Sequence, residues 1–223
     1  MGVASWRVLD GEDAEFVMSS SVAQCAWVSQ LRPLIVELSK PGDTVFDPFA
    51  GWGTTLVAAA VEGRRGIGME ISEERVAEAR ERLAGYSDQT MLCGDARKPP
   101  VPDESVDLVL CDLPYFGTSA EHASTEEGTL YALQEYDDYL GAIEDVFAQL
   151  ARVLKPGAHA VICVQNRRVA GRFVPLAWDA ARVLGRHLVL GDERIHLYQK
   201  AASGDDPTVT NRAHEYLLVA TKA

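Results

Sequence analysis

Hydrophobic and polar positions alternate regularly along most of this 223-residue chain. Short apolar runs bounded by glycine, proline or aspartate predict buried strands, and these runs occupy residues 44–46, 66–70, 90–93, 106–111 and 159–164. Between them, apolar side chains recur at helical spacing in residues 22–40, 54–63, 72–85, 137–154 and 174–184. This order of strand and helix predicts a doubly wound, mostly parallel α/β sheet.

The last part of the chain has a different pattern. Residues 188–199 and 215–221 are alternating or apolar runs joined by a polar stretch, which predicts an antiparallel hairpin. Together with the five earlier runs, it gives an expected sheet of seven strands.

The first 40 residues are expected to pack on this core. Residues up to Ser21 predict an irregular or short helical extension that covers one edge, and Pro33 indicates a break or a new first turn in the helical pattern. We therefore divide the chain into an N-terminal extension with helices, residues 1–40, and one main domain, residues 41–223. Within that domain, residues 118–136 form a polar, acidic loop that is either a lid over substrate or a disordered insertion.

The candidate chemistry lies at the carboxyl ends of the predicted strands. The run DPFAGWGTT (47–55) joins the first strand to a helix through Gly51 and Gly53, which permit positive φ and a close approach of ligand to backbone. Glu70 ends the second strand and Asp95 follows the third, so three carboxylates are expected along one edge of a parallel sheet. A tight turn alone would explain the glycines, but the added carboxylates indicate a small-molecule cofactor site.

Two motifs carry a resemblance to a known family. DPFAGWGTT resembles the cofactor motif of class I S-adenosylmethionine-dependent methyltransferases. DLPY (112–115) resembles the catalytic D-P-P-Y of those members that methylate amino groups of nucleobases, at adenine N6 or cytosine N4 in DNA. The resemblance extends from about Pro41 to the end and departs from the pattern at Leu113, where proline is usual. It implies a Rossmann-like methyltransferase fold with a C-terminal antiparallel hairpin.

The resemblance also implies S-adenosylmethionine as cofactor and assigns residues to it. Glu70 is expected to accept the ribose hydroxyls, Asp95 to lie near the adenine amine, and Asp47 to favour the positive end of the cofactor. The full expected cofactor-binding set is Asp47, Pro48, Phe49, Ala50, Gly51, Gly53, Thr54, Thr55, Glu70, Ile71, Asp95, Ala96 and Asp112. No metal ligand is expected.

DLPY suits methyl transfer to an aromatic amine, whose lone pair is delocalised and therefore a poor nucleophile. The Asp112 carboxylate and the Leu113 carbonyl can each accept one amine hydrogen, which directs the lone pair and offsets the growing positive charge. Pro114 stiffens the turn, and Tyr115 offers a face on which a base can stack. A plain strand end and turn would also use Asp and Pro, but the position at the end of the fourth strand favours catalysis. The expected catalytic set is Asp112, Leu113, Pro114 and Tyr115, and the expected substrate-binding set is Tyr115, Phe116, Gly117, Arg167 and Arg168.

The charge distribution complicates a nucleic-acid substrate. The net charge is −12, yet residues 99–151 hold twelve acidic residues and no lysine or arginine, whereas residues 152–200 hold nine basic against three acidic residues. A nucleic-acid binder normally has a basic footprint, and this chain has half of one. A solvated basic face is therefore an alternative explanation for Arg167 and Arg168.

Other features bound the cellular setting. The composition, 47% hydrophobic and 24% charged, is that of a globular domain. Neither a signal peptide nor an apolar run of membrane-spanning length occurs, which predicts a cytoplasmic protein. The cysteines lack C-x-x-C spacing, so we expect reduced core thiols, with Cys93, Cys111 and Cys163 in buried strands and Cys25 in a helix.

The substrate stays open at the level of the sequence. The leading interpretation is a base amino group in DNA, with the base flipped out of any duplex. No target-recognition domain fits into the chain, so specificity is read by residues 118–136 or supplied by a protein partner. The alternatives are guanine N2 in tRNA, whose methylases carry DLPY itself, a small molecule or nucleoside amine, and a binding subunit without activity.

Overall fold

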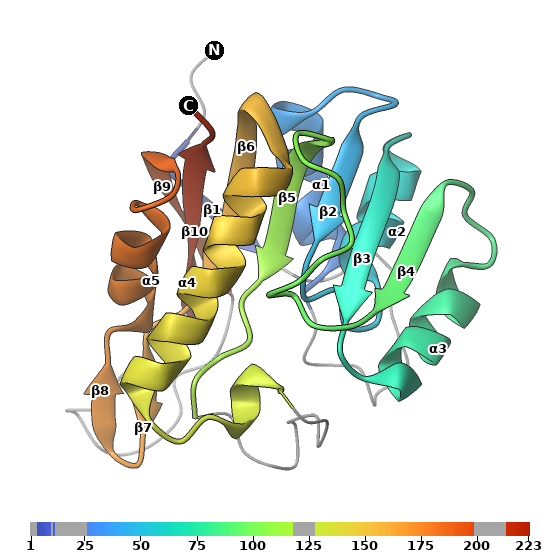
Figure 1. Ribbon diagram of the computed structural model, residues 1–223. Coiled ribbons are helices and arrows are strands. Elements are labelled where there is room, and N and C mark those ends of the chain that lie inside the picture. The colour runs from blue at the N-terminus through green and yellow to red at the C-terminus, as the bar shows by residue number, and fades with distance from the viewer. Residues whose placement is uncertain (1–3, 10, 12–25, 118–127, 199–212) are drawn as a thin grey trace.

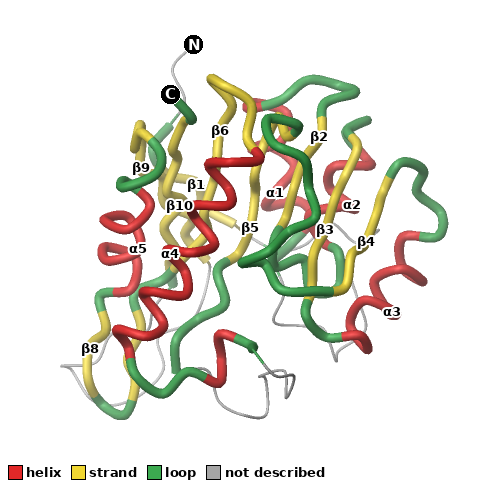
Figure 2. The backbone as a smooth tube through the Cα atoms, in the orientation of Figure 1, coloured by secondary structure: helices red, strands yellow, loops and turns green. Residues whose placement is uncertain are grey.

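The computed structural model describes residues 4–9, 11, 26–117, 128–198 and 213–223. A central β-sheet is covered by helices on both faces (Figures 1 and 2). The helices are α1 (Val28–Leu38), α2 (Thr54–Val61), α3 (Glu73–Leu83), α4 (Tyr136–Val153) and α5 (Leu176–Leu184). The strands are β1 (Trp6–Leu9), β2 (Thr44–Asp47), β3 (Arg65–Glu70), β4 (Gln89–Cys93), β5 (Val106–Asp112), β6 (Leu154–Val164), β7 (Arg167–Val169), β8 (Arg172–Val174), β9 (Val189–Tyr198) and β10 (His214–Thr221).

The main sheet has the strand order β1-β9-β10-β6-β5-β2-β3-β4. Strands β4, β3, β2, β5 and β6 run parallel, and β10 is antiparallel to both β6 and β9. From β2 the chain proceeds outward to β3 and β4 and then crosses back to β5 on the other side of β2. The strand order therefore reverses between β2 and β5, which is where open α/β sheets bind ligands. The expected doubly wound α/β fold is confirmed.

Two apolar layers hold the sheet between the helices. In α4, the buried side chains of Tyr139, Ile143, Val146 and Leu150 recur every three or four residues and face the sheet, as an amphipathic helix requires. α4 and α5 share one core with that face, while α1, α2 and α3 share a second core with the opposite face. Each fully buried large apolar side chain contributes roughly 1.5–3 kcal/mol, so these layers fix the strand ends that carry the candidate site.

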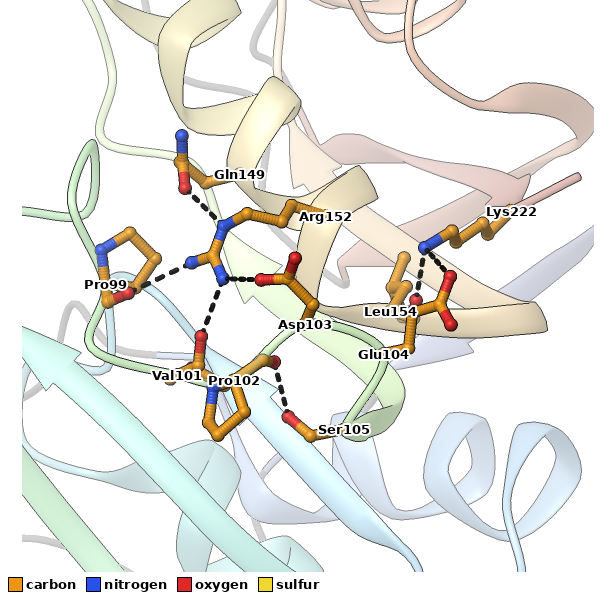
Figure 3. Close-up of polar contacts among 10 residues, drawn as sticks. All are labelled: Pro99, Val101, Pro102, Asp103, Glu104, Ser105, Gln149, Arg152, Leu154 and Lys222. Atoms are coloured by element: carbon orange, nitrogen blue, oxygen red, sulfur yellow. Dashed lines mark hydrogen bonds and ion pairs between the residues drawn. The ribbon is translucent and has the colours of Figure 1, made fainter.

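A polar cluster stabilises the amino end of β5 (Figure 3). The Arg152 guanidinium at the end of α4 donates to the carbonyls of Val101 at 2.8 Å and Pro99 at 3.1 Å, and it forms an ion pair with Asp103. Nε of Arg152 also donates to Gln149 at 2.8 Å. This cluster anchors the loop before β5, at the amino ends of the parallel strands and therefore opposite the candidate site.

The N-terminal segment differs from the expectation. Residues Trp6–Leu9 form a strand rather than an irregular or helical extension, and this strand pairs in parallel with β9 from Trp6↔Ile195 to Leu9↔Tyr198. It does cover one edge of the sheet, which thereby has eight strands instead of seven. The edge of β9 that does not pair with β10 supplies the hydrogen-bonding partners of β1. The pattern of four residues in the sequence cannot reveal so distant a partner. Residues 12–25, with Cys25, lie outside the described residues.

Pro33 neither breaks nor starts a helix, because it lies inside α1. Proline lacks an N–H, so one internal hydrogen bond is missing there. Burial of Val28, Leu31, Leu34 and Ile35 along the same helix offsets that loss.

Three later parts of the chain also differ from the sequence-based description. The strand expected at residues 159–164 already begins at Leu154, directly after α4, and the N–H of Gly157 donates to the carbonyl of Lys222 at 2.9 Å. Residues 167–174, which were not predicted to be regular, form the two-stranded β7–β8 hairpin. Cys93 is exposed rather than buried, whereas Cys111 and Cys163 are buried free thiols.

No helix in the described part of the chain is both long and apolar enough for a membrane span.

Candidate active site

The two sequence motifs meet at the carboxyl ends of β2 and β5. Asp47 is the last residue of β2 and Asp112 the last of β5, and the two strands are direct neighbours. Val45 and Leu110, two positions earlier on the same strands, belong to the core beneath α1 and α2. Because side chains alternate along a strand, Asp47 and Asp112 point to that same face of the sheet.

Asp47 organises the DPFAGWGTT loop. Its Oδ2 accepts a hydrogen bond from the Thr55 hydroxyl at 2.6 Å, and its Oδ1 accepts one from the Phe49 N–H at 2.9 Å. Burial raises the pKa of Asp47 to about 7, against the effect of these two hydrogen bonds, and the charge of Glu70 raises it further. The carboxylate therefore closes the loop and also places a titratable group beside Asp112.

The two glycines of the loop have different surroundings. Gly53 is the N-cap of α2 with φ of 78°, and a Cβ on it would lie 3.2 Å from Cδ1 of Leu83 on α3. Gly51 has φ of 49°, and a Cβ on it would meet no atom of the described residues within 4 Å. Only Gly51 therefore borders open space. We expected a ligand to approach the backbone closely at both glycines. At Gly53, the group that approaches the backbone is instead the Leu83 side chain of α3.

Glu70 and Asp95 follow neighbouring strands but have different partners. Glu70 is 8% exposed at the end of β3, and its Oε1 accepts a hydrogen bond from the N–H of Ser72 at 3.0 Å. Both oxygens of Asp95 accept hydrogen bonds from Arg97 at 2.6–2.9 Å. Partial burial acts to raise the pKa of Asp95, but the hydrogen bonds and charge of Arg97 outweigh it and lower that pKa. Asp95 is thus already paired, which limits the acceptor role expected from the sequence.

The end of the acidic loop borders these carboxylates, which the sequence analysis did not specify. A Cβ on Gly128 would lie 3.6 Å from Ile71 and 4.0 Å from Asp95. The carbonyl of Gly128 accepts a hydrogen bond from Arg97 at 3.2 Å. A short 3-10 helix, Leu130–Ala132, follows. The part of the expected lid at residues 118–127 lies outside the described residues.

Tyr131, in that short helix, is a residue that sequence reasoning missed. Burial raises its pKa to about 12, the charges of Asp112 and Glu70 act in the same direction, and a hydrogen bond with Arg75 opposes them. Its hydroxyl therefore lies within electrostatic reach of both strand ends. Its aromatic ring in a largely polar, acidic loop was the signal for it.

Asp112 is held by its own motif. The Tyr115 hydroxyl donates a hydrogen bond to Oδ1 of Asp112 at 2.8 Å. Burial raises the pKa of Asp112 to about 8, the charges of Glu215 and Asp47 add to this, and Tyr115 and Arg167 oppose it. A carboxyl group that titrates near neutral pH can exchange a proton with substrate, and such groups cluster at functional sites.

Three other residues of the motif region have structural contacts. Leu113 is 1% exposed and donates its N–H to the carbonyl of Cys163 at 3.0 Å, which the usual proline could not do. The carbonyl of Pro114 accepts a hydrogen bond from Tyr139 at 2.6 Å. Phe116 is 9% exposed, with its ring centroid 5.1 Å from that of Tyr136 and 5.5 Å from that of Tyr139. Phe116 thus packs against two tyrosines of α4, and its expected contact with substrate stays a prediction.

A buried polar cluster also adjoins Asp112. Glu215 on β10 accepts a hydrogen bond from the Gln30 amide on α1, and Nδ1 of His196 on β9 lies 3.2 Å from its Oε1. All three side chains are at most 3% exposed. Since they come from three separate elements, no local sequence pattern could have identified them.

The sequence profile of the DNA methylase family, which comprises N6 and N4 methylases, matches residues 28–81 and 106–223. This chain belongs to the N6/N4 DNA methylase family. Both motifs of the candidate site lie in the matched ranges, whereas Asp95 and β4 lie between them.

Individual relatives match this chain over shorter stretches. It is 36% identical over 118 residues to the tRNA (guanine(10)-N2)-dimethyltransferase of Methanothermobacter thermautotrophicus, a match covering 51% of this chain and 32% of that protein. It is 52% identical over 52 residues to the orphan methyltransferase M.BamHII of Bacillus amyloliquefaciens, covering 23% and 20% of the two chains. The solved structure of TrmN from Thermus thermophilus has a TM-score of 0.63 and 19% identity, covering 91% of this chain and 51% of that chain. The matches thus span a third or less of the length of these two sequence relatives.

Proposed function

We propose that this methylase transfers a methyl group from S-adenosylmethionine to an exocyclic amino group of a nucleobase in DNA, at adenine N6 or cytosine N4. The observation that carries the proposal is that Asp47 and Asp112 end neighbouring strands at the reversal point of the sheet, with Tyr115 bonded to Asp112. Membership of the N6/N4 DNA methylase family supports the same reaction.

The surroundings of DPFAGWGTT fit S-adenosylmethionine. Gly51 presents backbone to open space, and Glu70 offers a buried carboxylate for the ribose hydroxyls. Gly128 and Ile71 border the place proposed for the adenine, with Asp95 beside them. When bound, the cofactor supplies an electrophilic methyl group on a sulfonium cation. Asp47 and Asp112 are carboxyl groups whose ionisation such a cation favours.

The residues of DLPY then orient the amine and handle its proton. Oδ1 of Asp112 accepts from the Tyr115 hydroxyl, so its second oxygen and the carbonyl of Leu113 are left to accept the two amine hydrogens. This arrangement directs the lone pair and stabilises the growing positive charge. Asp112 is also suited to take up the proton that the amine loses, because its pKa of about 8 lies near neutral pH. Arg167 lies 5.0 Å from the centroid of the Tyr115 ring, and a base would stack on the opposite face.

The test is transfer of a labelled methyl group from S-adenosylmethionine to three pools: duplex DNA, bulk tRNA, and free nucleosides with small amines. We expect label in DNA, recovered as N6-methyladenine or N4-methylcytosine after digestion. The Asp112→Ala variant is the control, and it should bind the cofactor without transferring label. Label in DNA from that variant would show that the catalytic assignment is wrong.

One observation favours a second candidate, guanine N2 in tRNA. The tRNA (guanine(10)-N2)-dimethyltransferase relative matches over 118 residues, and tRNA methylases of this kind resemble the chain in carrying DLPY. Label confined to the tRNA pool, as N2-methylguanosine, would favour this reaction. Label confined to the third pool would favour a nucleoside or small-molecule amine, which suits the net charge of −12. A cytoplasmic location, a protein partner that supplies specificity, and the division of the chain at residue 40 stay predictions.

A further inference from the structure

The β7–β8 hairpin lies beside the candidate active site, at the end of the sheet toward which β5 points (Figure 1). Two contacts fasten it there. The Arg167 guanidinium on β7 lies 5.0 Å from the centroid of the Tyr115 ring. Gly117, just after the catalytic motif, packs so closely on Val169 that a Cβ at position 117 would lie 2.6 Å from its methyl groups. The hairpin is therefore positioned by the loop that directly follows Asp112.

The strand register divides the hairpin into two faces. Arg167 is paired with Val174 and Val169 with Arg172, while Arg168 is paired with Phe173. Paired residues of antiparallel strands share a face, so Arg168 and Phe173 lie opposite to Val169 and Val174. The two valines pack against the core. Arg168 and Phe173 consequently form the outer face of the hairpin.

This outer face continues onto the first turn of α5. Phe173 is 49% exposed and Trp178 is 54% exposed, and their ring centroids lie 5.8 Å apart at 57°. Neither ring belongs to the core, and the tilted pair presents aromatic surface on the same face as the exposed Arg168. Arg172 is also exposed, but it lies on the valine side of the hairpin, directly after the turn.

The charge of the hairpin is opposite to that of the whole chain. Residues 167–174 contain three arginines and no acidic residue, in a protein of net charge −12. Within the described part of the chain, no salt bridge joins these arginines to a carboxylate. Arginines contact phosphates, and exposed aromatic rings stack on unpaired bases. The combination beside an active site fits a strand of nucleic acid.

We propose that the β7–β8 hairpin and Trp178 bind a DNA strand next to the target base. Arg168 on the outer face contacts one phosphate, and Arg172, which is exposed beside the turn on the other face, contacts a neighbouring phosphate. The Phe173–Trp178 pair contacts an unstacked base or sugar, and Arg167 fixes the hairpin to Tyr115. The inference rests on the proposed function and adds to it the surface through which an acidic chain holds DNA. Single-stranded or locally opened DNA should bind better than closed duplex, because aromatic rings reach only unstacked bases.

The charge test compares two double variants that each remove two exposed arginines. Arg168→Gln/Arg172→Gln changes the hairpin, and Arg7→Gln/Arg65→Gln changes β1 and the amino end of β3. Each variant loses two positive charges, so the two variants have equal net charges. Binding to a labelled single-stranded DNA is measured over a range of salt concentrations. We expect the magnitude of the slope of log affinity against log salt to fall by about 1.4 in the hairpin variant, about 0.7 for each of the two lost phosphate contacts. The slope should stay unchanged in the control. Equal slopes in the two variants would overturn the proposal.

The aromatic test uses Trp178→Ala, an exposed position whose change leaves the core intact. Affinity for single-stranded DNA should fall about tenfold with an unchanged salt slope, while calorimetry should give unchanged cofactor affinity. Sedimentation of the same variant identifies the competing occupant: if Trp178→Ala dissociates a dimer and leaves DNA binding intact, the patch is a contact between copies of this chain and the proposal is wrong.

The outcomes separate this proposal from the proposed function. If the wild type methylates DNA and the hairpin variants bind it equally well, the hairpin proposal alone fails. If the wild type neither binds nor methylates DNA, both fail. If tRNA binds more tightly than DNA and the hairpin variants lose it, the choice of DNA is wrong for both.

Discussion

The hydroxyl of Tyr115 donates a hydrogen bond to Oδ1 of Asp112 across 2.8 Å. The two residues are three positions apart in the same motif. The hydroxyl and the ring of the tyrosine have separate uses. Its hydroxyl holds the carboxyl group and opposes the rise of the Asp112 pKa. Its ring is then available as a stacking surface.

Tyr115→Phe tests the hydroxyl while keeping the ring. Without the hydrogen bond, the pKa of Asp112 should rise further above 8, so the pH at which turnover is half-maximal should move upward. Turnover at pH 7 should fall about tenfold, because a hydrogen bond to a charged group contributes roughly 1.5–3 kcal/mol. The measurement is the pH profile of kcat, with Tyr115→Ala as the variant that also loses stacking. An unmoved profile for Tyr115→Phe would remove the role given to the hydroxyl.

Asp112→Asn should abolish turnover and stabilise the fold at alkaline pH. The pKa of Asp112 is raised in the folded protein to about 8 from its usual value near 4. Between these values the folded state keeps a proton that the unfolded chain has lost, so stability falls as pH rises through this window. An uncharged amide avoids that loss, so its added stability should be small at pH 4 and grow up to pH 8, by about 1.4 kcal/mol for each pH unit at most. Urea unfolding at both pH values measures it, and a difference that does not grow with pH contradicts the raised pKa.

Cofactor affinity should depend on pH through the same carboxyl groups. The pKa values of Asp47 and Asp112 are raised to about 7 and about 8, and a sulfonium cation binds better to the ionised forms. The affinity for S-adenosylmethionine should therefore rise from pH 6 to pH 9. S-adenosylhomocysteine has a neutral sulfur and is the matched control. Calorimetry with both ligands checks the prediction, and parallel pH dependences would show that these carboxylates do not sense the cation.

Substitutions at Gly51 and Gly53 should have different effects. Both have positive φ, so a side chain at either costs about 1–2 kcal/mol of stability. Gly51→Val adds a side chain in open space and should lower cofactor affinity at least tenfold. Gly53→Ala places a methyl group 3.2 Å from Leu83 and should lower the melting temperature more while affecting affinity less. Calorimetry and thermal melting of both variants give the comparison, and equal affinity losses would contradict the distinction.

Leu113→Pro restores the residue usual in the family and should destabilise this protein. Proline cannot donate the hydrogen bond that Leu113 makes to Cys163, and its ring fills less of the buried space. We expect a loss of about 2–4 kcal/mol in the free energy of unfolding. Turnover per folded molecule should change only a few-fold, because the carbonyl at position 113 is kept. Leu113→Ala retains the N–H, so it separates the stability lost to the cavity from the stability lost with the hydrogen bond. A Leu113→Pro variant as stable as wild type would refute this explanation.

The sequence by itself determined the elements whose signals are local. The turn before β2, the glycine loop after it and the Ser72 N-cap of α3, whose hydroxyl accepts from the N–H of Arg75, all act within a few residues, where side-chain preferences decide the backbone. The strand ends of Asp47, Glu70 and Asp112 followed from the same reading, since parallel strands bring their carboxyl ends to one edge.

The tertiary structure alone decided which side chains meet at that edge. The pairing of β1 with β9, the burial of Phe116 against α4, and the bond between Gln30 and Glu215, 185 residues apart, join distant parts of the chain. Such contacts depend on how whole elements pack, and no periodicity in one element contains that information. The β7–β8 hairpin belongs to the same group, because the sequence left Arg167 open between substrate binding and a solvated face, and packing placed it beside Tyr115.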